Sequence, residues 1–186
     1  MKSQELKKLT WKKLSSKVVY ESPWLTTIED SVIQPNGKKG IYSVVERKPA
    51  NFIIPYDSKT DSIYLLKEFR YPLQKEIWNI PAGAIEKGET ELGSAKKELF
   101  QETGIKARKW KKLGKVYSSP GHLRSHLNVY VATNLNFSQL GLDKLEGDES
   151  ILEIKSFKIS TIKKMMAENK IVCGPTLASL GIFFAK

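Results

Sequence analysis

The chain has 186 residues, a formal net charge of +11 and a single cysteine, Cys173. This length suits one domain with a buried core, or one domain with a small appendage. One cysteine excludes an internal disulfide, no apolar run approaches the roughly 20 residues that a membrane helix needs, and the N-terminus lacks the apolar core of a secretory signal. We therefore expect a cytoplasmic protein that does not enter a membrane. The positive charge suggests an anionic partner, with a lysine-rich solvated surface as the alternative.

The first part of the chain predicts a small antiparallel β unit. Its β-branched segments are separated by turn residues, Pro23 in one place and Pro35-Asn36-Gly37 in the other. Such a unit has little core of its own, so we expect residues 1–48 to pack on the main domain or on a second copy of the chain. The expected strands are residues 18–20, 25–33 and 41–46.

The remainder, residues 49–186, mixes strands with a few helices and shows no internal repeat. We expect strands at residues 51–55, 62–69, 77–80, 109–117, 126–132 and 152–159 and helices at residues 90–103, 162–168 and 176–184. The basic segment 106–115 is interpreted as a loop that enters a strand, in preference to a nucleic-acid-binding stripe. This order predicts an α+β fold rather than a regular βαβ repeat.

Residues 81–105, PAGAIEKGETELGSAKKELFQETGI, are the stretch around which the rest of the chain is organised. Gly83 and Gly88 are interpreted as turns that lead into the helix at residues 90–103. Thr90 can cap its N-terminus, and Gly104 suits the position after its C-terminus. The expected buried stripe consists of Leu92, Ala95 and Leu99.

Glu98 and Glu102 are four residues apart, so on a helix they share one face. Two carboxylates in this arrangement can hold a divalent metal ion, and magnesium commonly takes one or two protein carboxylates together with water and substrate phosphate. A solvent-facing acidic helix face is the more common role of such a pair. The two glutamates by themselves leave both alternatives open.

The spacing around the pair decides between them. Gly83 is followed by five residues and then Glu89, and seven residues later comes Lys97-Glu98-Leu99-Phe100-Gln101-Glu102-Thr103-Gly104-Ile105. This resembles the Nudix box, G-x5-E-x7-R-E-U-x-E-E-x-G-U, where U is a bulky aliphatic residue. Because seven of nine defined positions match over 23 residues, the resemblance is specific. It implies a Nudix fold, a mixed β-sheet sandwiched between helices.

Further segments resemble the ADP-ribose pyrophosphatase branch of that family: FIIPYD, LLKEFRYPLQKEIWNIPAG, SSPG and the terminal TLASL. Pro120 lies sixteen residues after Gly104, where that branch carries a marker proline. The resemblance covers roughly residues 18–186.

The resemblance also implies roles for individual residues. Glu98 and Glu102 match the main magnesium ligands, the carbonyl of Ala82 matches a backbone ligand, and Glu89 matches a glutamate that supports the loop. Arg70 matches an arginine that contacts the substrate phosphate or the neighbouring ribose. The residues that match contacts to the adenine and the diphosphate are Trp24, Tyr42 and Arg47. For Trp24 and Tyr42 packing within the N-terminal unit is the alternative, and for Arg70 a surface ion pair.

Three positions depart from the family pattern. Lys97 replaces an arginine, and a lysine cannot form the same planar fork. Gln101 replaces a glutamate, which removes one negative charge. Ser125 stands where many relatives carry the glutamate that acts as general base. The later stretch LEGDES offers Glu149 as the candidate base, with Asp148 and Glu146 behind it.

The expected function is Mg²⁺-dependent hydrolysis of a nucleoside diphosphate sugar, with ADP-ribose cleaved to AMP and ribose 5-phosphate. Mn²⁺ is an alternative cofactor, and GDP-mannose and UDP-glucose are alternative substrates. A Nudix-type module with weakened catalysis that senses a nucleotide or binds nucleic acid is the alternative from another class, and the positive charge favours it. Relatives pair through their N-terminal region, so we expect a homodimer, and nucleic acid is the less favoured partner.

Overall fold

The computed structural model describes residues 10–137 and 150–186, and the candidate bases Glu146, Asp148 and Glu149 lie outside these residues. The chain divides into two compact units. The N-terminal unit comprises the residues up to Lys48 together with Ser119–Ser125, and the C-terminal unit comprises Pro49–Ser118 and His126–Lys186. The sequence-based division after residue 48 did not include the later segment, which returns to the N-terminal unit.

The N-terminal unit is a four-stranded sheet in the order β1-β2-β3-β9. Its strands are β1 (Lys12–Glu21), β2 (Thr26–Ile33), β3 (Lys39–Glu46) and β9 (Leu123–Arg124). The first three pair antiparallel, and β9 pairs parallel with the end of β3. Strand β1 is longer than the expected 18–20, because its polar first half pairs with β2 although it lacks the β-branched pattern on which the prediction depended.

The C-terminal unit contains a seven-stranded sheet whose main path runs β11-β5-β4-β10-β8, with β6 beside β5 and β7 beside β4. Its strands are β4 (Ala50–Asp57), β5 (Ser62–Arg70), β6 (Lys75–Asn79), β7 (Ala82–Ala84), β8 (Lys106–Val116), β10 (Leu127–Asn136) and β11 (Ile151–Lys158). A short 3₁₀ helix, η1 (Tyr71–Leu73), joins β5 to β6. Strands β4 and β10 pair parallel and the other neighbours antiparallel, so the sheet is mixed.

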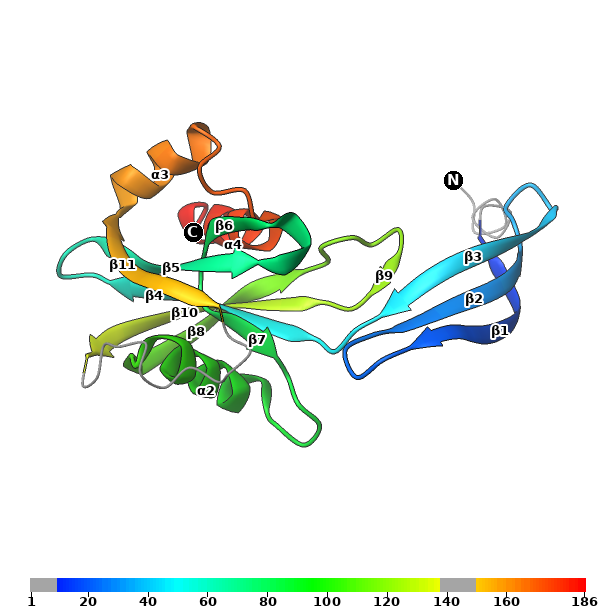
Figure 1. Ribbon diagram of the computed structural model, residues 1–186, viewed down its shortest axis with the longest axis horizontal. Helices are drawn as coiled ribbons and strands as arrows, with labels where there is room; N and C mark the ends of the chain where they lie inside the picture. Colours follow the sequence, from blue (N-terminus) through cyan, green and yellow to red (C-terminus); the bar gives the residue numbers. More distant parts are fainter. Residues whose placement is uncertain (1–9, 138–149) are drawn as a thin grey trace. The chain divides into compact units, whose positions relative to one another are not determined.

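Three helices cover the two faces of this sheet, with α2 (Glu91–Thr103) on one side and α3 (Ile159–Ala167) and α4 (Gly174–Phe184) on the other (Figure 1). Successive residues of β4 point to opposite faces. Ile53 accordingly joins the core beneath α2, with Ala95 and Leu99, whereas Ile54 joins the core that contains Leu180. The arrangement confirms the predicted α+β fold, a mixed sheet between helices.

Two sequence-based predictions need correction. The strand expected at residues 109–117 begins three residues earlier, at Lys106, because the start of the basic segment, expected as a loop entering the strand, also pairs with β10 at the edge of the sheet. Leu92, expected in the buried stripe of α2, is exposed, and the stripe that packs on the sheet continues instead through Ala95 and Leu99. None of the described helices has the length and apolar character that a membrane crossing requires.

Candidate active site

Three consecutive residues of β7 each meet one residue of α2. The backbone N–H of Ala82 donates to Oε2 of Glu102 at 2.9 Å. The hydroxyl of Ser94 donates to the carbonyl oxygen of Ala84 at 3.3 Å. Between these contacts the Glu98 carboxylate lies against Gly83. Ser94, Glu98 and Glu102 follow one another at intervals of four residues, so one stripe of the helix rests along one short strand.

Gly83 is the point of closest approach between the two elements. A Cβ atom built on Gly83 would lie 2.1 Å from Cδ of Glu98, a separation that no real side chain tolerates. Any larger residue would therefore displace the Glu98 carboxylate. The sequence-based interpretation of Gly83 as a turn is wrong, because it lies in β7 opposite Asn51, and the turn is at Gly88, where φ is 90°.

The residues present fit a divalent cation. Glu102 is only 7% exposed, and Glu98 and Glu102 direct hard carboxylate oxygens at the same segment of backbone. Among the described residues there is no group of three or more His, Cys, Asp or Glu side chains that could hold a metal. Two carboxylates with a backbone carbonyl, water and substrate oxygens form a donor set of the kind magnesium accepts, so this finding does not conflict with the predicted ligands.

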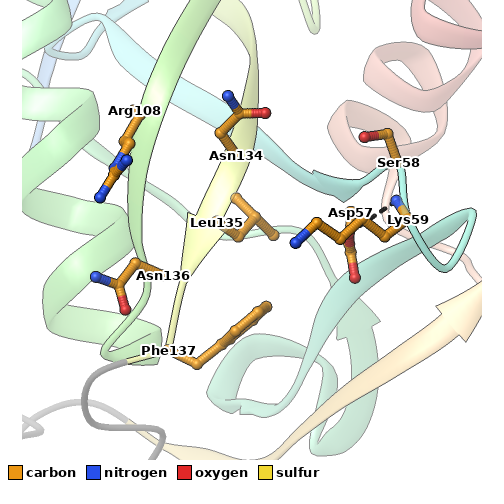
Figure 2. Close-up of a pocket in the computed structure, with 8 residues that line it drawn as sticks. All are labelled: Asp57, Ser58, Lys59, Arg108, Asn134, Leu135, Asn136 and Phe137. Atoms are coloured by element: carbon orange, nitrogen blue, oxygen red, sulfur yellow. Dashed lines mark hydrogen bonds between the residues drawn. The ribbon is translucent and has the colours of Figure 1, made fainter.

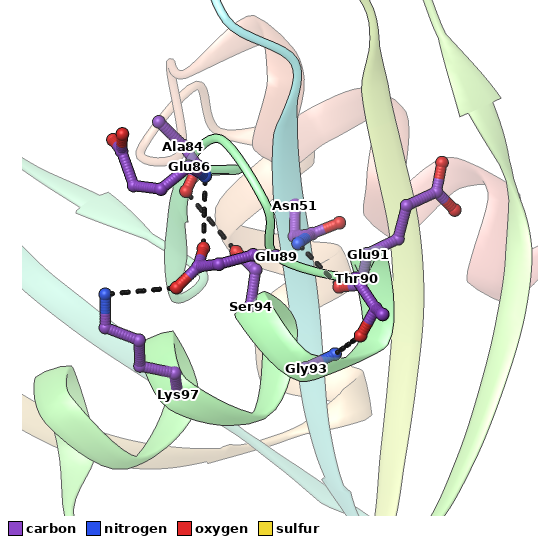
Figure 3. A network of polar contacts seen from close by, with 9 residues as sticks. All are labelled: Asn51, Ala84, Glu86, Glu89, Thr90, Glu91, Gly93, Ser94 and Lys97. Atoms are coloured by element: carbon purple, nitrogen blue, oxygen red, sulfur yellow. Dashed lines mark hydrogen bonds and ion pairs between the residues drawn. The ribbon is translucent and has the colours of Figure 1, made fainter.

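The loop before α2 is held by Glu89. Its Oε2 accepts from the backbone N–H of Glu86 at 3.0 Å, and its Oε1 lies 3.4 Å from Nζ of Lys97 (Figure 3). The backbone hydrogen bond first, and Lys97 in addition, lower the pKa of Glu89. Lys97, at the box position where relatives carry arginine, is thus in contact with a carboxylate.

Arg70 lies at the end of β5, where its guanidinium pairs with Oε2 of Glu68 at 2.8 Å. The same oxygen of Glu68, a buried residue, also accepts from the side-chain amide of Asn79 at 2.5 Å. The Arg70 side chain remains 46% exposed. The ion pair therefore orients Arg70 without removing it from solvent.

The predicted residues of the N-terminal unit are separate from one another. Trp24 lies in the turn between β1 and β2 and is 75% exposed, so its ring is not packed into the unit. Tyr42 is half-buried, donates to the carbonyl of Gly121 at 2.6 Å and packs edge-on against Trp11, with the ring centres 5.0 Å apart. Within the described chain Trp24 and Tyr42 thus do not stack as a pair.

The structure also shows the surroundings of Arg47 and Ser125. Arg47 is exposed and directly follows the last residue of β3. Ser125, which stands where many relatives carry a catalytic glutamate, donates its hydroxyl to the carbonyl of Lys48 at 2.9 Å. Ser125 thus ties the returning segment to the end of the first one.

A separate hollow of about 460 Å³ lies at the other end of β4 (Figure 2). The site strand β7 pairs with the start of β4, at residues Ala50–Phe52, whereas the hollow contacts Asp57, the last residue of β4. Its lining contains none of the predicted site residues. The lining residues are Asp57, Ser58, Lys59, Arg108, Asn134, Leu135, Asn136 and Phe137.

Sequence reasoning missed Ser94 and Asn51. Ser94 is fully buried against β7. The four-residue spacing that it shares with Glu98 and Glu102 is a signal that was available in the sequence. Asn51 donates to the carbonyl of Glu91 at 2.9 Å, and no spacing connects two residues that are 40 positions apart.

Comparison with known proteins gives a consistent result. Residues 11–45 match the nucleoside diphosphate sugar hydrolase N-terminal domain, and residues 46–172 match the NUDIX domain. The chain is 28% identical over 167 residues to an ADP-ribose pyrophosphatase of Bacillus subtilis (strain 168), covering 89% of this chain and 88% of that protein. It is 32% identical over 148 residues to a methanol dehydrogenase activator of Bacillus methanolicus, covering 74% and 80%.

A solved structure described as an ADP compounds hydrolase superposes with a TM-score of 0.79 at 18% identity, over 94% of this chain and 92% of that one. At this identity the likeness bears on the fold alone. The NUDIX domain match, in contrast, spans well over half of the sequence and includes β7, α2 and the carboxylate pair that they hold. The chain belongs to the Nudix hydrolase family.

Proposed function

We propose that this protein hydrolyses the pyrophosphate bond of a nucleoside diphosphate sugar, and that ADP-ribose is its substrate. The observation that carries the proposal is the placement of Glu98 and Glu102 against β7, which makes a compact carboxylate site. The match of residues 11–45 to a nucleoside diphosphate sugar hydrolase domain and the similarity to an ADP-ribose pyrophosphatase support the substrate class.

Glu98, Glu102 and the carbonyl of Ala82 would hold Mg²⁺, with Mn²⁺ as the alternative. A bound divalent cation neutralises charge on the pyrophosphate oxygens and promotes ionisation of water. In the reaction one water forms a P–O bond to one phosphorus, the bond from that phosphorus to the bridging oxygen breaks, and the bridging oxygen leaves on the other phosphate. With ADP-ribose the products are AMP and ribose 5-phosphate.

Other residues bind the substrate and accept the proton. Arg70 is oriented by Glu68 and can contact phosphate or ribose through its exposed face. Trp24, Tyr42 and Arg47 contact the base and the diphosphate, and the exposure of Trp24 leaves its ring accessible. Glu149 accepts the proton of the attacking water.

We further propose that residues 1–48 provide the dimer contact of a homodimer. Strand β1 is the edge of its sheet, and all ten of its residues are exposed, including the apolar side chains of Leu14, Val18 and Val19. An exposed apolar edge favours pairing with another chain. The cytoplasmic location remains a prediction.

The test of the activity is release of AMP from ADP-ribose with Mg²⁺ or Mn²⁺, alongside GDP-mannose and UDP-glucose. Glu102→Gln should lower kcat by about 100-fold or more, since a metal ligand contributes several kcal/mol to stabilising transition-state charge. Glu168→Gln is the matched control, because this glutamate lies just after α3 and pairs only with lysines in the contacts described. Absence of turnover of every nucleotide sugar by the wild type would contradict the proposal.

The same assay tests the remaining roles. Glu149→Gln should lower kcat by about 100-fold, the low end of general-base effects, and an unchanged rate would remove Glu149 from the mechanism. Trp24→Ala should raise KM for ADP-ribose with little change in kcat. If KM stays at the wild-type value, Trp24 does not contact the base.

A further inference from the structure

Two fully buried asparagines lie side by side beneath the start of α2. Asn51 on β4 is in register with Asn128 on β10, and neither side chain reaches solvent. The amide of Asn128 donates to Oδ1 of Asn51 at 3.3 Å. The amide of Asn51 in turn donates to the carbonyl of Glu91 at 2.9 Å, as Figure 3 shows. The result is a chain of hydrogen bonds from β10 through β4 to the first residue of α2.

This polar chain is placed where an apolar residue would be expected. Two residues further along β4, on the same face, Ile53 packs against α2 in the hydrophobic core. Burying a carboxamide in such a position is unfavourable unless its hydrogen bonds are made. The donor bond of Asn51 is directed to the helix and its acceptor bond to Asn128 of the sheet, so its polarity connects the sheet to α2.

The main chain of Asn51 also contacts β7, the strand that α2 packs against at the site. Its backbone lies directly across from Gly83 in the ladder between β4 and β7. One residue is therefore joined to β7 through its main chain and to α2 through its side chain. These are the two elements that meet at Gly83 and Glu98, where there is no room for an added methyl group.

Additional contacts hold the same end of α2. The carboxylate of Glu91 pairs with Lys112 of β8 and accepts from the hydroxyl of Tyr130 of β10 at 3.4 Å. Glu98 follows Glu91 by seven residues, close to two helical turns, and therefore lies on the same face. Because Glu91 and Glu98 belong to one continuous helix, a rotation or shift of α2 at Glu91 would also displace Glu98.

We propose that Asn51 is a positioning residue of the active site, and that Asn128 fixes the orientation of its amide. Together the two asparagines fix the position of α2 relative to β7 and thereby the positions of the Glu98 and Glu102 carboxylates. This inference rests on the proposed function, since it concerns the geometry of the same carboxylates. A residue that only stabilised the fold would lower the unfolding temperature without changing the affinity of the folded protein for a metal.

The test compares Asn51→Leu, which keeps the branched outline of the side chain and removes both its donor and its acceptor, with the full-length wild type. Mn²⁺ binding is measured by electron paramagnetic resonance, without substrate, at a temperature where both proteins are folded. We expect the Kd for Mn²⁺ to rise by about 10-fold to 100-fold, as for other groups that orient metal ligands. In the activity assay kcat should fall much more than KM changes.

The control is Ser179→Ala, which removes a buried hydroxyl of α4 that donates to the carbonyl of Pro175. It should lower the unfolding temperature and leave Mn²⁺ binding unchanged.

If Asn51→Leu fails to fold, Asn51→Ser provides a smaller change. Hydrogen exchange of the backbone amides of residues 94–99 is then compared with that of residues 176–184. Exchange should become faster only in α2.

Wild-type affinity for Mn²⁺ and wild-type kcat in Asn51→Leu or Asn51→Ser would overturn the inference. In that case Glu102→Gln should still bind Mn²⁺ more weakly than the wild type, so the proposed function would remain supported without the inference about Asn51. A wild type that neither binds Mn²⁺ nor hydrolyses a nucleotide sugar would instead remove the proposed function, and the inference with it.

Discussion

At the scale of single residues, the site depends on a glycine that makes room for a carboxylate. Glu98 is held against the backbone of β7 because Gly83 has no side chain. The Nudix-box spacing identified Gly83, Glu98 and Glu102 from the sequence, but it did not say why a glycine is needed. The close approach supplies that reason, and it gives a direct experiment.

Gly83→Ala should retain the fold and lose most activity. The added methyl group meets the end of the flexible Glu98 side chain rather than backbone, so the carboxylate moves and the strand stays in place. A misplacement of about 1 Å can lower a rate by roughly 100-fold, which is the fall in kcat that we expect. Gly181→Ala is the control, because nothing lies within 4 Å of a Cβ at that position. Equal kcat in the two variants would argue against a tight contact at Gly83.

A second residue-scale prediction concerns pH. The hydrogen bond from Lys112 is the largest influence that lowers the pKa of Glu91, and burial opposes it. Because the pKa is lower in the folded state, the stabilisation is complete above the ordinary value of 4.5 and is lost as the pH falls through the folded-state pKa. The difference in unfolding temperature between the wild type and Glu91→Gln should therefore shrink from pH 7 to pH 3. A difference that stays constant with pH would show that Lys112 does not shift this group.

At the scale of secondary-structure elements, α2 was the most predictable part of the chain. Thr90 accepts from the N–H of Gly93 at 3.1 Å, and Gly104 follows the helix with φ at 70°, so both ends have the expected caps. A cap depends on residues that are close in sequence, which is why spacing alone could identify it. The same is true of the turn at Pro35-Asn36-Gly37, where Gly37 has φ at 83°.

Thr90→Ala should lower the free energy of unfolding by about 1 kcal/mol, because it removes the oxygen that accepts from Gly93. Urea denaturation is the measurement. Thr161→Ala is the matched control, since Thr161 is exposed within α3, where alanine is the better helix former. If both substitutions have the same effect, the hydroxyl of Thr90 does not cap α2.

Strands were predicted less well than α2, for a physical reason. Strand β8 has a lysine or arginine at six of its eleven positions, so its sequence has little apolar alternation. Its first three residues, which were not expected to be strand, join it because they lie in the ladder with β10. Strands β7 and β9 are too short to have a pattern. Each forms because a longer strand, β4 or β3, offers it hydrogen-bonding partners.

At the scale of the whole molecule, we predict that the protein forms a homodimer. Val18 lies on the edge strand β1, is 54% exposed and has the exposed apolar residues Leu14 and Val19 on the same strand, and contiguous exposed apolar surface marks an interaction site. Sedimentation equilibrium of the wild type should give about twice 21.1 kDa, and Val18→Lys should shift the protein towards the monomer. Val172→Lys, at an exposed valine of the C-terminal unit, should remain dimeric. A monomeric wild type at micromolar concentrations would contradict the prediction.

The sequence by itself determined the family, the carboxylate pair, the ends of α2 and the α+β class, because each of these depends on the identity and spacing of residues near one another. Only the tertiary structure decided that Gly83 is a strand residue, that β8 begins at Lys106 and lies at the edge of the sheet, and that Asn51 joins β7 to α2. These features depend on which strands become neighbours. Such pairings join residues that lie far apart along the chain, and local spacing does not specify them.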